Sequence, residues 1–301
     1  MRKLKVLLAA LLSLITIHTT AAATNPVKKA PSRKGGLAIK VSGGGWGNAQ
    51  PQDIETLLQS TAAELWAYFP QRELPPIVVV HEDSGPKTLY EKGPAGEYIV
   101  RLSASDQRWS QYAYQFAHEF CHILSNYDHR RQVGEAREQD QWFEEALCET
   151  ASLYTLEHMA KTWAATPPYP QWTDYAPALQ DYADNLRNEG HRRLPLRATL
   201  AGWFSGNRAA LDENPYHRDR NEVVANLLLP LFEAHPEHWE AIGYLNPAGF
   251  PEPRNFAQYL DNWRQATPEK YRLFIGQVIE MFGLEPPDTM RTAQESKPGP
   301  V

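Results

Sequence analysis

Residues 118 to 122, His-Glu-Phe-Cys-His, place two metal-binding side chains four positions apart. On a helix, residues four apart lie on one face, so His118 and His122 can bind one ion while Glu119 sits beside its open side. Zinc held in this way lowers the pKa of a bound water from about 16 toward ~7, and a neighbouring carboxylate can accept that water's proton. The motif therefore predicts a catalytic zinc site in which Glu119 is the general base of a hydrolysis.

The segment that carries the motif, residues 106–125, is predicted to be helical because its apolar residues recur at intervals of three and four. These apolar positions are Trp109, Tyr112, Ala113, Phe116, Phe120 and Ile123. The two histidines fall on a different stripe of the helix from these residues. They are therefore not simply part of its apolar face.

A catalytic zinc usually keeps three protein ligands and one open position, so a third donor is needed. Glu145 lies early in a second helical segment and is the preferred candidate. Glu149 follows one turn later on the same face, where it is placed to accept the second ring N–H of His118 and fix its tautomer. Glu144 stays a lesser alternative as ligand, because spacing alone cannot separate adjacent glutamates.

Asp128, six residues after His122, is the rival third ligand. A metal site that uses this position needs a glycine where the chain turns back after the helix. The residue at that place is Ser125. This departure favours Glu145 over Asp128.

The motif followed by Trp142-x-x-Glu145-Ala146-x-x-Glu149 resembles the gluzincin group of zinc metallopeptidases, which includes thermolysin and the aminopeptidase-N-like enzymes. The resemblance covers residues 77–154. It implies a small zincin-like sheet beside the active-site helix and a peptidase activity. It also implies these roles: zinc ligands His118, His122 and Glu145, general base Glu119, and support of the first histidine by Glu149.

The same group uses a later Tyr or His to stabilise the oxyanion formed during hydrolysis, and Tyr216 and His217 offer both types. A hydrogen-bond donor aimed at that developing charge can contribute about 3 kcal/mol. The two residues are therefore candidate catalytic residues. The G-x-M-E-N signature of the group's aminopeptidases is absent before the motif, so the resemblance does not support cleavage from a free amino terminus.

The first 23 residues have the pattern of a secretory signal peptide: a short basic start, an apolar run at 6–17, and small residues ending at Ala23. The apolar run is too short to span a bilayer, and no later segment approaches the length of a membrane helix. Cleavage near Ala23 would take the formal charge from −6 to −9 by removing Arg2, Lys3 and Lys5. We therefore expect an exported protein, periplasmic or secreted, with no nucleic-acid partner.

An exported protein can form disulfides, and the chain has two cysteines, Cys121 and Cys148. Each lies three residues from a proposed zinc ligand, so two ligand helices that lie side by side would bring the thiols close together. We hypothesise a Cys121–Cys148 disulfide that joins these helices, with a contribution of about 3 kcal/mol in the chain-entropy model. Two buried free thiols are the alternative.

The remaining pattern predicts an α+β fold with a mostly helical C-terminal lobe. Strands are expected at 37–41, 77–80 and 98–102, the last as the edge strand beside the substrate cleft. The predicted divisions are a signal peptide 1–23, a disordered lead-in 24–36, a zincin-like catalytic lobe 37–160, a helical lobe 161–284 and a flexible tail 285–301.

Two functions follow from these observations. The first is an exported zinc peptidase that hydrolyses peptide bonds in a peptide or protein substrate, with Zn²⁺ as cofactor. The second is a non-catalytic binding or structural protein on the same scaffold. The presence of Glu119 argues against the second, because a purely structural zinc site needs no general base.

Overall fold

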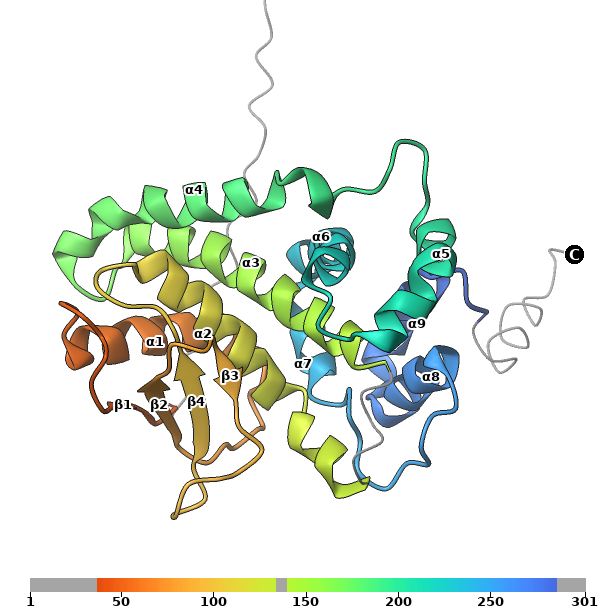
Figure 1. The fold of residues 1–301 in the computed structure, drawn as a ribbon, viewed down its shortest axis with the longest axis horizontal. Coiled ribbons are helices and arrows are strands. Elements are labelled where there is room, and N and C mark those ends of the chain that lie inside the picture. The colour runs from red at the N-terminus through yellow and green to blue at the C-terminus, as the bar shows by residue number, and fades with distance from the viewer. Residues whose placement is uncertain (1–36, 134–139, 286–301) are drawn as a thin grey trace, which may run out of the picture. The chain divides into compact units, whose positions relative to one another are not determined.

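The computed structural model describes residues 37–133 and 140–285. The predicted signal peptide, the lead-in 24–36 and all but the first residue of the tail 285–301 lie outside the described residues. In the described part the chain is α+β, with many helices and one four-stranded sheet (Figure 1). None of the helices in this part is both long enough and apolar enough to cross a membrane.

The sheet is built from four short strands, β1 (Ile39–Ser42), β2 (Ile77–His81), β3 (Lys87–Thr88) and β4 (Tyr98–Leu102). Their order is β1-β2-β4-β3; β1, β2 and β4 are parallel, and β3 runs antiparallel to β4. The prediction that 98–102 is the edge strand is wrong. Strand β4 lies inside the sheet, and the edge next to it is formed by β3. The two residues of β3 have no apolar alternation from which a strand could be predicted.

One face of the sheet is buried, as the period of two requires. Ile77 and Val79 of β2 are fully buried, whereas Val78 and Val80 between them are partly exposed. Helices α1 (Pro51–Trp66) and α2 (Trp109–Leu124) pack on the sheet and on each other (Figure 1). The sheet thereby fixes the position of α2, the helix that carries the His-Glu-Phe-Cys-His motif.

Helix α3 (Gln141–Ala165) is the central element of the fold and contacts α1, α2, α4 and α6 (Figure 1). It is buried over most of its circumference. The predicted boundary between a catalytic lobe ending at 160 and a helical lobe beginning at 161 falls inside this helix. The described residues all belong to one compact unit.

The other helical elements follow α3 or connect it to α2. They are η1 (Tyr127–Val133), η2 (Pro170–Tyr175), α4 (Ala176–Arg187), η3 (Gly190–Arg192), α5 (Leu200–Glu213), α6 (Arg218–Ala234), η4 (Pro236–His238), α7 (Trp239–Ile242), α8 (Phe256–Ala266) and α9 (Glu269–Met281). The motif helix begins at Trp109 and not at the predicted residue 106, because Asp106 has a φ of 55° that a right-handed helix does not allow.

The Glu64 carboxyl of α1 supplies a prediction about stability that is independent of any activity. Burial raises its pKa from 4.5 to about 7, against the lowering effects of a hydrogen bond with Thr162 and the charge of Lys161. Because the pKa of Glu64 is higher in the folded protein than in the unfolded chain, protonation of Glu64 stabilises the fold. This stabilisation is fully present below pH 4.5 and is lost as the pH rises through 7. The loss amounts to about 3 kcal/mol at most.

We expect Glu64→Gln to be more stable than the wild type at pH 8 by up to this amount and to differ little at pH 4.5. Urea denaturation at both pH values measures the difference. Glu73→Gln, at an exposed position, is the control and should change the free energy of unfolding by less than about 0.5 kcal/mol. An identical pH dependence in the wild type and Glu64→Gln would contradict the prediction.

Candidate metal and catalytic site

Helix α2 brings His118 and His122 to one wall of a cavity, with Glu119 beside them. Both rings are largely covered: the side chains are 20% and 12% exposed. Glu119 is 4% exposed. The helix is held on its opposite side by the apolar residues of its core-facing stripe, as the spacing predicts. The two imidazoles therefore have a fixed direction toward the cavity.

Glu145, from the first turns of α3, faces the two imidazoles. Its Oε2 lies 3.2 Å from His118 Nε2, and its Oε1 lies 3.6 Å from His122 Nε2. Bonds of ~2.0–2.1 Å from a tetrahedral zinc place neighbouring ligand atoms about 3.3 Å apart. The two separations between imidazole and carboxylate thus match neighbouring ligands of a tetrahedral zinc, and the three side chains are of its usual donor types.

The second ring nitrogens of both histidines face carboxylates. His122 Nδ1 lies 2.9 Å from Glu144 Oε1, and His118 Nδ1 lies 3.9 Å from Glu149 Oε2. Such partners fix the tautomer and the ring orientation of a metal-binding histidine. The predicted place of Glu149 beside His118 agrees with this geometry. Glu144 is on the far side of His122 from Glu145, so it orients a ring and is not the third donor of the cluster.

The Glu144 carboxylate is buried but fully surrounded by donors. Ser125 Oγ donates to its Oε1 at 2.7 Å, Asn246 Nδ2 donates to its Oε2 at 3.0 Å, and Arg130 Nε lies 3.0 Å from Oε2. These contacts join α2, η1, α3 and the segment after α7. They hold a charged group at a depth where an unpaired carboxylate would be costly.

The charges of the cluster favour ionised carboxylates. Burial by itself would raise the pKa of Glu145, but the charge of His122 and the hydrogen bond with His118 hold it well below its usual range. Burial would also raise the pKa of Glu144, and the hydrogen bond with His122 and the charge of Arg130 lower it. Burial would lower the pKa of His122, but the charge of Glu145 and the hydrogen bond with Glu144 raise it well above its usual value. A divalent cation that binds here therefore has to displace the proton of His122, because a ligating imidazole is neutral.

Glu119 is held by the edge strand of the sheet. Thr88 Oγ1 of β3 donates to Glu119 Oε2 at 2.8 Å and is 3.1 Å from the Glu119 carbonyl oxygen. Thr88 is itself buried. Oε2 of Glu119 thus accepts the hydrogen bond from Thr88, and the other carboxylate oxygen, Oε1, remains to accept a proton from the cavity.

The cavity between α2, α3, α6 and the edge strand has a volume of about 460 Å³. It is large enough for several residues of a peptide. Its walls hold the histidines and glutamates described above together with Pro86, Lys87, Thr88, Tyr90, Tyr114, Gln115, Tyr127, Gln141, Tyr216, Arg218, Asn221 and Glu222.

The two candidate oxyanion-stabilising residues have different positions. Tyr216 lines the cavity, and its hydroxyl accepts a hydrogen bond from Gln141 Nε2 at 3.1 Å; the same Nε2 is 3.4 Å from Glu145 Oε1. Gln141 therefore connects Tyr216 to Glu145. His217 does not line this cavity and instead stands at the amino end of α6. Tyr216 is the one of the two that the structure places with the site.

Asp128, the rival third ligand, lies in η1 outside the cavity. Its Oδ2 forms an ion pair with Lys92 Nζ at 3.0 Å. The chain turns after α2 at Asn126, which has a left-handed φ of 59°, whereas Ser125, where the rival site would need a glycine, has a φ of −80°. That turn leads Asp128 away from the histidines, and Glu145 takes the position that Asp128 would have needed.

Cys121 and Cys148 are both buried and are free thiols in this structure. The two thiols are in contact between α2 and α3. Burial, and to a smaller extent the hydrogen bond with Cys121, raises the pKa of the Cys148 thiol well above its usual value. Cys148 also lies with His118 and His122, each offering a donor atom within 4.8 Å of the others. It does not line the cavity, however, whereas Glu145 does. The disulfide stays a prediction.

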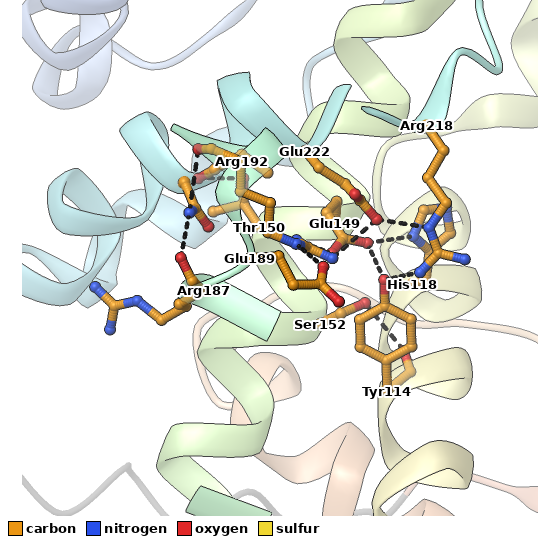
Figure 2. A network of polar contacts seen from close by, with 12 residues as sticks. Tyr114, His118, Glu149, Thr150, Ser152, Arg187, Glu189, Arg192, Arg218 and Glu222 are labelled. Atoms are coloured by element: carbon orange, nitrogen blue, oxygen red, sulfur yellow. Dashed lines mark hydrogen bonds and ion pairs between the residues drawn. The ribbon is translucent and has the colours of Figure 1, made fainter. Parts of the chain in front are cut away.

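A network of buried charges connects His118 to helix α6 (Figure 2). The Arg192 side chain is fully buried and reaches three carboxylates: Nη1 is 2.7 Å from Glu149, Nη2 is 2.8 Å from Glu222, and Nε is 2.9 Å from Glu189. Tyr114 donates its hydroxyl to Glu149 Oε2. Arg192 thus neutralises the carboxylate that supports the first histidine.

Glu189, His191 and Glu222 form a second group whose donor atoms lie close enough for a metal ion. Arg192 contacts both glutamates, and Arg218 Nε lies 2.5 Å from Glu222 Oε1. The two guanidinium groups on Glu222 and the one on Glu189 compete with any cation. We therefore assign this group to the charge network and not to a metal.

No family model, curated protein or solved structure matches the chain. The function therefore has to be inferred from the site itself. Several of its residues had no signal in the sequence. Thr88, Gln141, Arg192 and Arg218 are single polar residues in segments that carry no motif, and only the fold brings them to the cavity or to the carboxylates around it. Glu144 had a signal, but its role depends on which side of His122 it occupies.

Proposed function

We propose that the chain is a zinc-dependent peptidase of gluzincin type that hydrolyses peptide bonds. One observation carries this proposal: His118 Nε2 and His122 Nε2 face the Glu145 carboxylate at 3.2 and 3.6 Å, in a cavity that also holds Glu119. Two imidazoles and a carboxylate are the donors of a zinc that keeps one open position, which distinguishes a catalytic site from a structural one, and Glu119 lies beside them. The N-terminal sequence adds that the enzyme is exported.

The residues of the site have separate roles in this mechanism. His118, His122 and Glu145 would hold the zinc, which would supply polarisation of the scissile carbonyl and a water acidic enough to lose a proton near neutral pH. Glu119 accepts that proton as the water attacks and then donates it to the leaving amine. Thr88 holds Glu119 in position. Tyr216 directs its hydroxyl to the oxygen of the carbonyl as negative charge develops there.

The edge strand β3 offers a means of holding an extended substrate. Leu89, which directly follows β3, donates its main-chain N–H to the carbonyl oxygen of Ile99 in β4. The antiparallel pattern alternates, which directs the main-chain N–H and C=O of the preceding residue, Thr88, away from β4. A peptide could pair with these groups beside Glu119. Recognition through main-chain groups tolerates many side chains.

Metal removal tests the proposed function. The protein purified from its export compartment should contain about one zinc per chain by elemental analysis and should cleave members of a mixed peptide library. Dialysis against a strong zinc chelator should abolish cleavage, and readdition of zinc should restore it, because no other described group can activate the water. Cleavage that persists at the same rate in the metal-free protein would refute a zinc peptidase.

A further inference from the structure

Helix α6 forms a wall of the cavity that the mechanism above does not use. Arg218, at the first position of this helix, lines the cavity together with Asn221 and Glu222. Its side chain is 65% exposed although its neighbour Glu222 is 3% exposed. The exposed Arg218 guanidinium group therefore lies beside the buried Glu222 carboxylate in the wall of the cavity (Figure 2).

The carboxylates of this wall already have partners. Glu149 contacts Arg192 and Tyr114, and Glu222 contacts Arg192, Arg218 and His191. Each carboxylate is thus held by groups of positive charge or by a hydroxyl donor. A substrate's free amino group would have to displace one of them. This wall is therefore poorly suited to bind the positively charged amino terminus of a peptide.

The guanidinium group of Arg218 is fixed but not saturated. Its Nε lies 2.5 Å from Glu222 Oε1, and its Nη2 donates to Tyr114 Oη at 2.8 Å. The Tyr114 ring lies beneath it, 5.8 Å from the guanidinium carbon to the ring centre. Among the described residues, no acceptor contacts Nη1. The contacts with Glu222 and with the hydroxyl and ring of Tyr114 hold the guanidinium group in place and leave Nη1 available to an incoming anion. Because the group is already ordered, binding an anion costs less entropy.

Arg218 is close enough to the metal-binding residues to bind the end of a cleaved peptide. Nη2 of Arg218 contacts Tyr114 Oη, Oη contacts Glu149 Oε2, and Oε2 is near His118 Nδ1; none of these separations exceeds 3.9 Å. An extended peptide advances ~3.3–3.6 Å per residue. A carboxylate held by Arg218 would accordingly lie no more than a few residues beyond the bond that is cut.

We infer that Arg218 binds the free α-carboxylate of the substrate, so that the enzyme removes a few residues from the carboxyl terminus of peptides. This inference rests on the proposed function and names its substrate class. A charge-assisted hydrogen bond to a carboxylate contributes about 1.5–3 kcal/mol, which corresponds to a preference of about 10- to 100-fold for a free carboxylate over an amide.

The test uses one N-acetylated hexapeptide library made in two forms, with C-terminal carboxylates and with C-terminal amides. Binding of each form to zinc-loaded Glu119→Gln protein is measured without turnover, and cleavage by the wild type is measured by mass spectrometry. We expect the acids to bind and react about 10- to 100-fold better, with a short carboxyl-terminal fragment released. Adding Arg218→Gln should reduce this preference to about one, and Arg218→Lys should keep only part of it, because it loses the planar fork.

Arg220→Gln is the matched control, because Arg220 lies two residues away on the same helix and contacts Asn207 instead of the cavity. It should keep the full preference for acids. The inference would be overturned if acids and amides bound equally well to the Glu119→Gln protein that retains Arg218. It would also be overturned if Arg218→Gln left the preference for acids and the melting temperature unchanged. Absence of cleavage of both forms by the wild type would instead overturn the proposed function, while the binding ratio would still decide the role of Arg218.

Discussion

Replacing Glu119 by glutamine is expected to lower kcat/KM by about 10²- to 10⁴-fold while the protein keeps its zinc. Glutamine has nearly the same shape as glutamate and can still accept the hydrogen bond from Thr88 Oγ1, so the fold should be unchanged. It cannot accept a proton from water or return one to the leaving amine. Steady-state cleavage of a peptide found in the library, together with elemental analysis of the same sample, measures both quantities.

Glu213→Gln is the control for this experiment. Glu213 is exposed at the end of α5 and does not line the cavity, so the substitution removes one carboxylate without touching the site. It should leave kcat/KM and the zinc content unchanged. Wild-type activity in Glu119→Gln with full zinc occupancy would show that another group takes the proton, and the mechanism proposed here would fail.

The parts of the fold that could be predicted are those with a strong apolar pattern. The β-branched run of β2 and the alternation of β4 gave strands whose bounds agree with the structure to within a residue. β3 could not be found, because Lys87 and Thr88 form a strand of only two residues whose existence depends on pairing with β4. The bounds of helix α5 could not be predicted either, since it contains two glycines and only three buried residues.

The site divides in the same way. His118, Glu119 and His122 belong to one helix, so their relation follows from helical geometry alone. The position of Glu145 depends on how α3 packs against α2, and its neighbour Glu144 is equally close in sequence. The structure separates them by the ring nitrogen that each one faces: Nε2 for Glu145 and Nδ1 for Glu144. The partners from distant segments, such as Thr88 and Arg218, depend on the whole fold.

The choice of the third ligand leads to the second large expected effect. Glu145→Gln should weaken zinc binding by more than about 100-fold, because a neutral amide oxygen replaces the charged ligand. Glu144→Gln should weaken it by only about 10- to 100-fold, as expected for a partner that orients a ligating histidine. Competition with a fluorescent zinc chelator at a fixed pH measures the three affinities.

Cys148→Ala distinguishes Glu145 from the other donor near the histidines. Cys148 is buried beneath the imidazoles and does not face the cavity, so its loss should lower the free energy of unfolding by about 1 kcal/mol and leave the zinc affinity close to that of the wild type. If Cys148→Ala loses zinc and Glu145→Gln retains it, the metal is held by His118, His122 and a buried thiolate. A zinc held there would be shielded from the cavity, and without an open position beside Glu119 it would be structural and not catalytic.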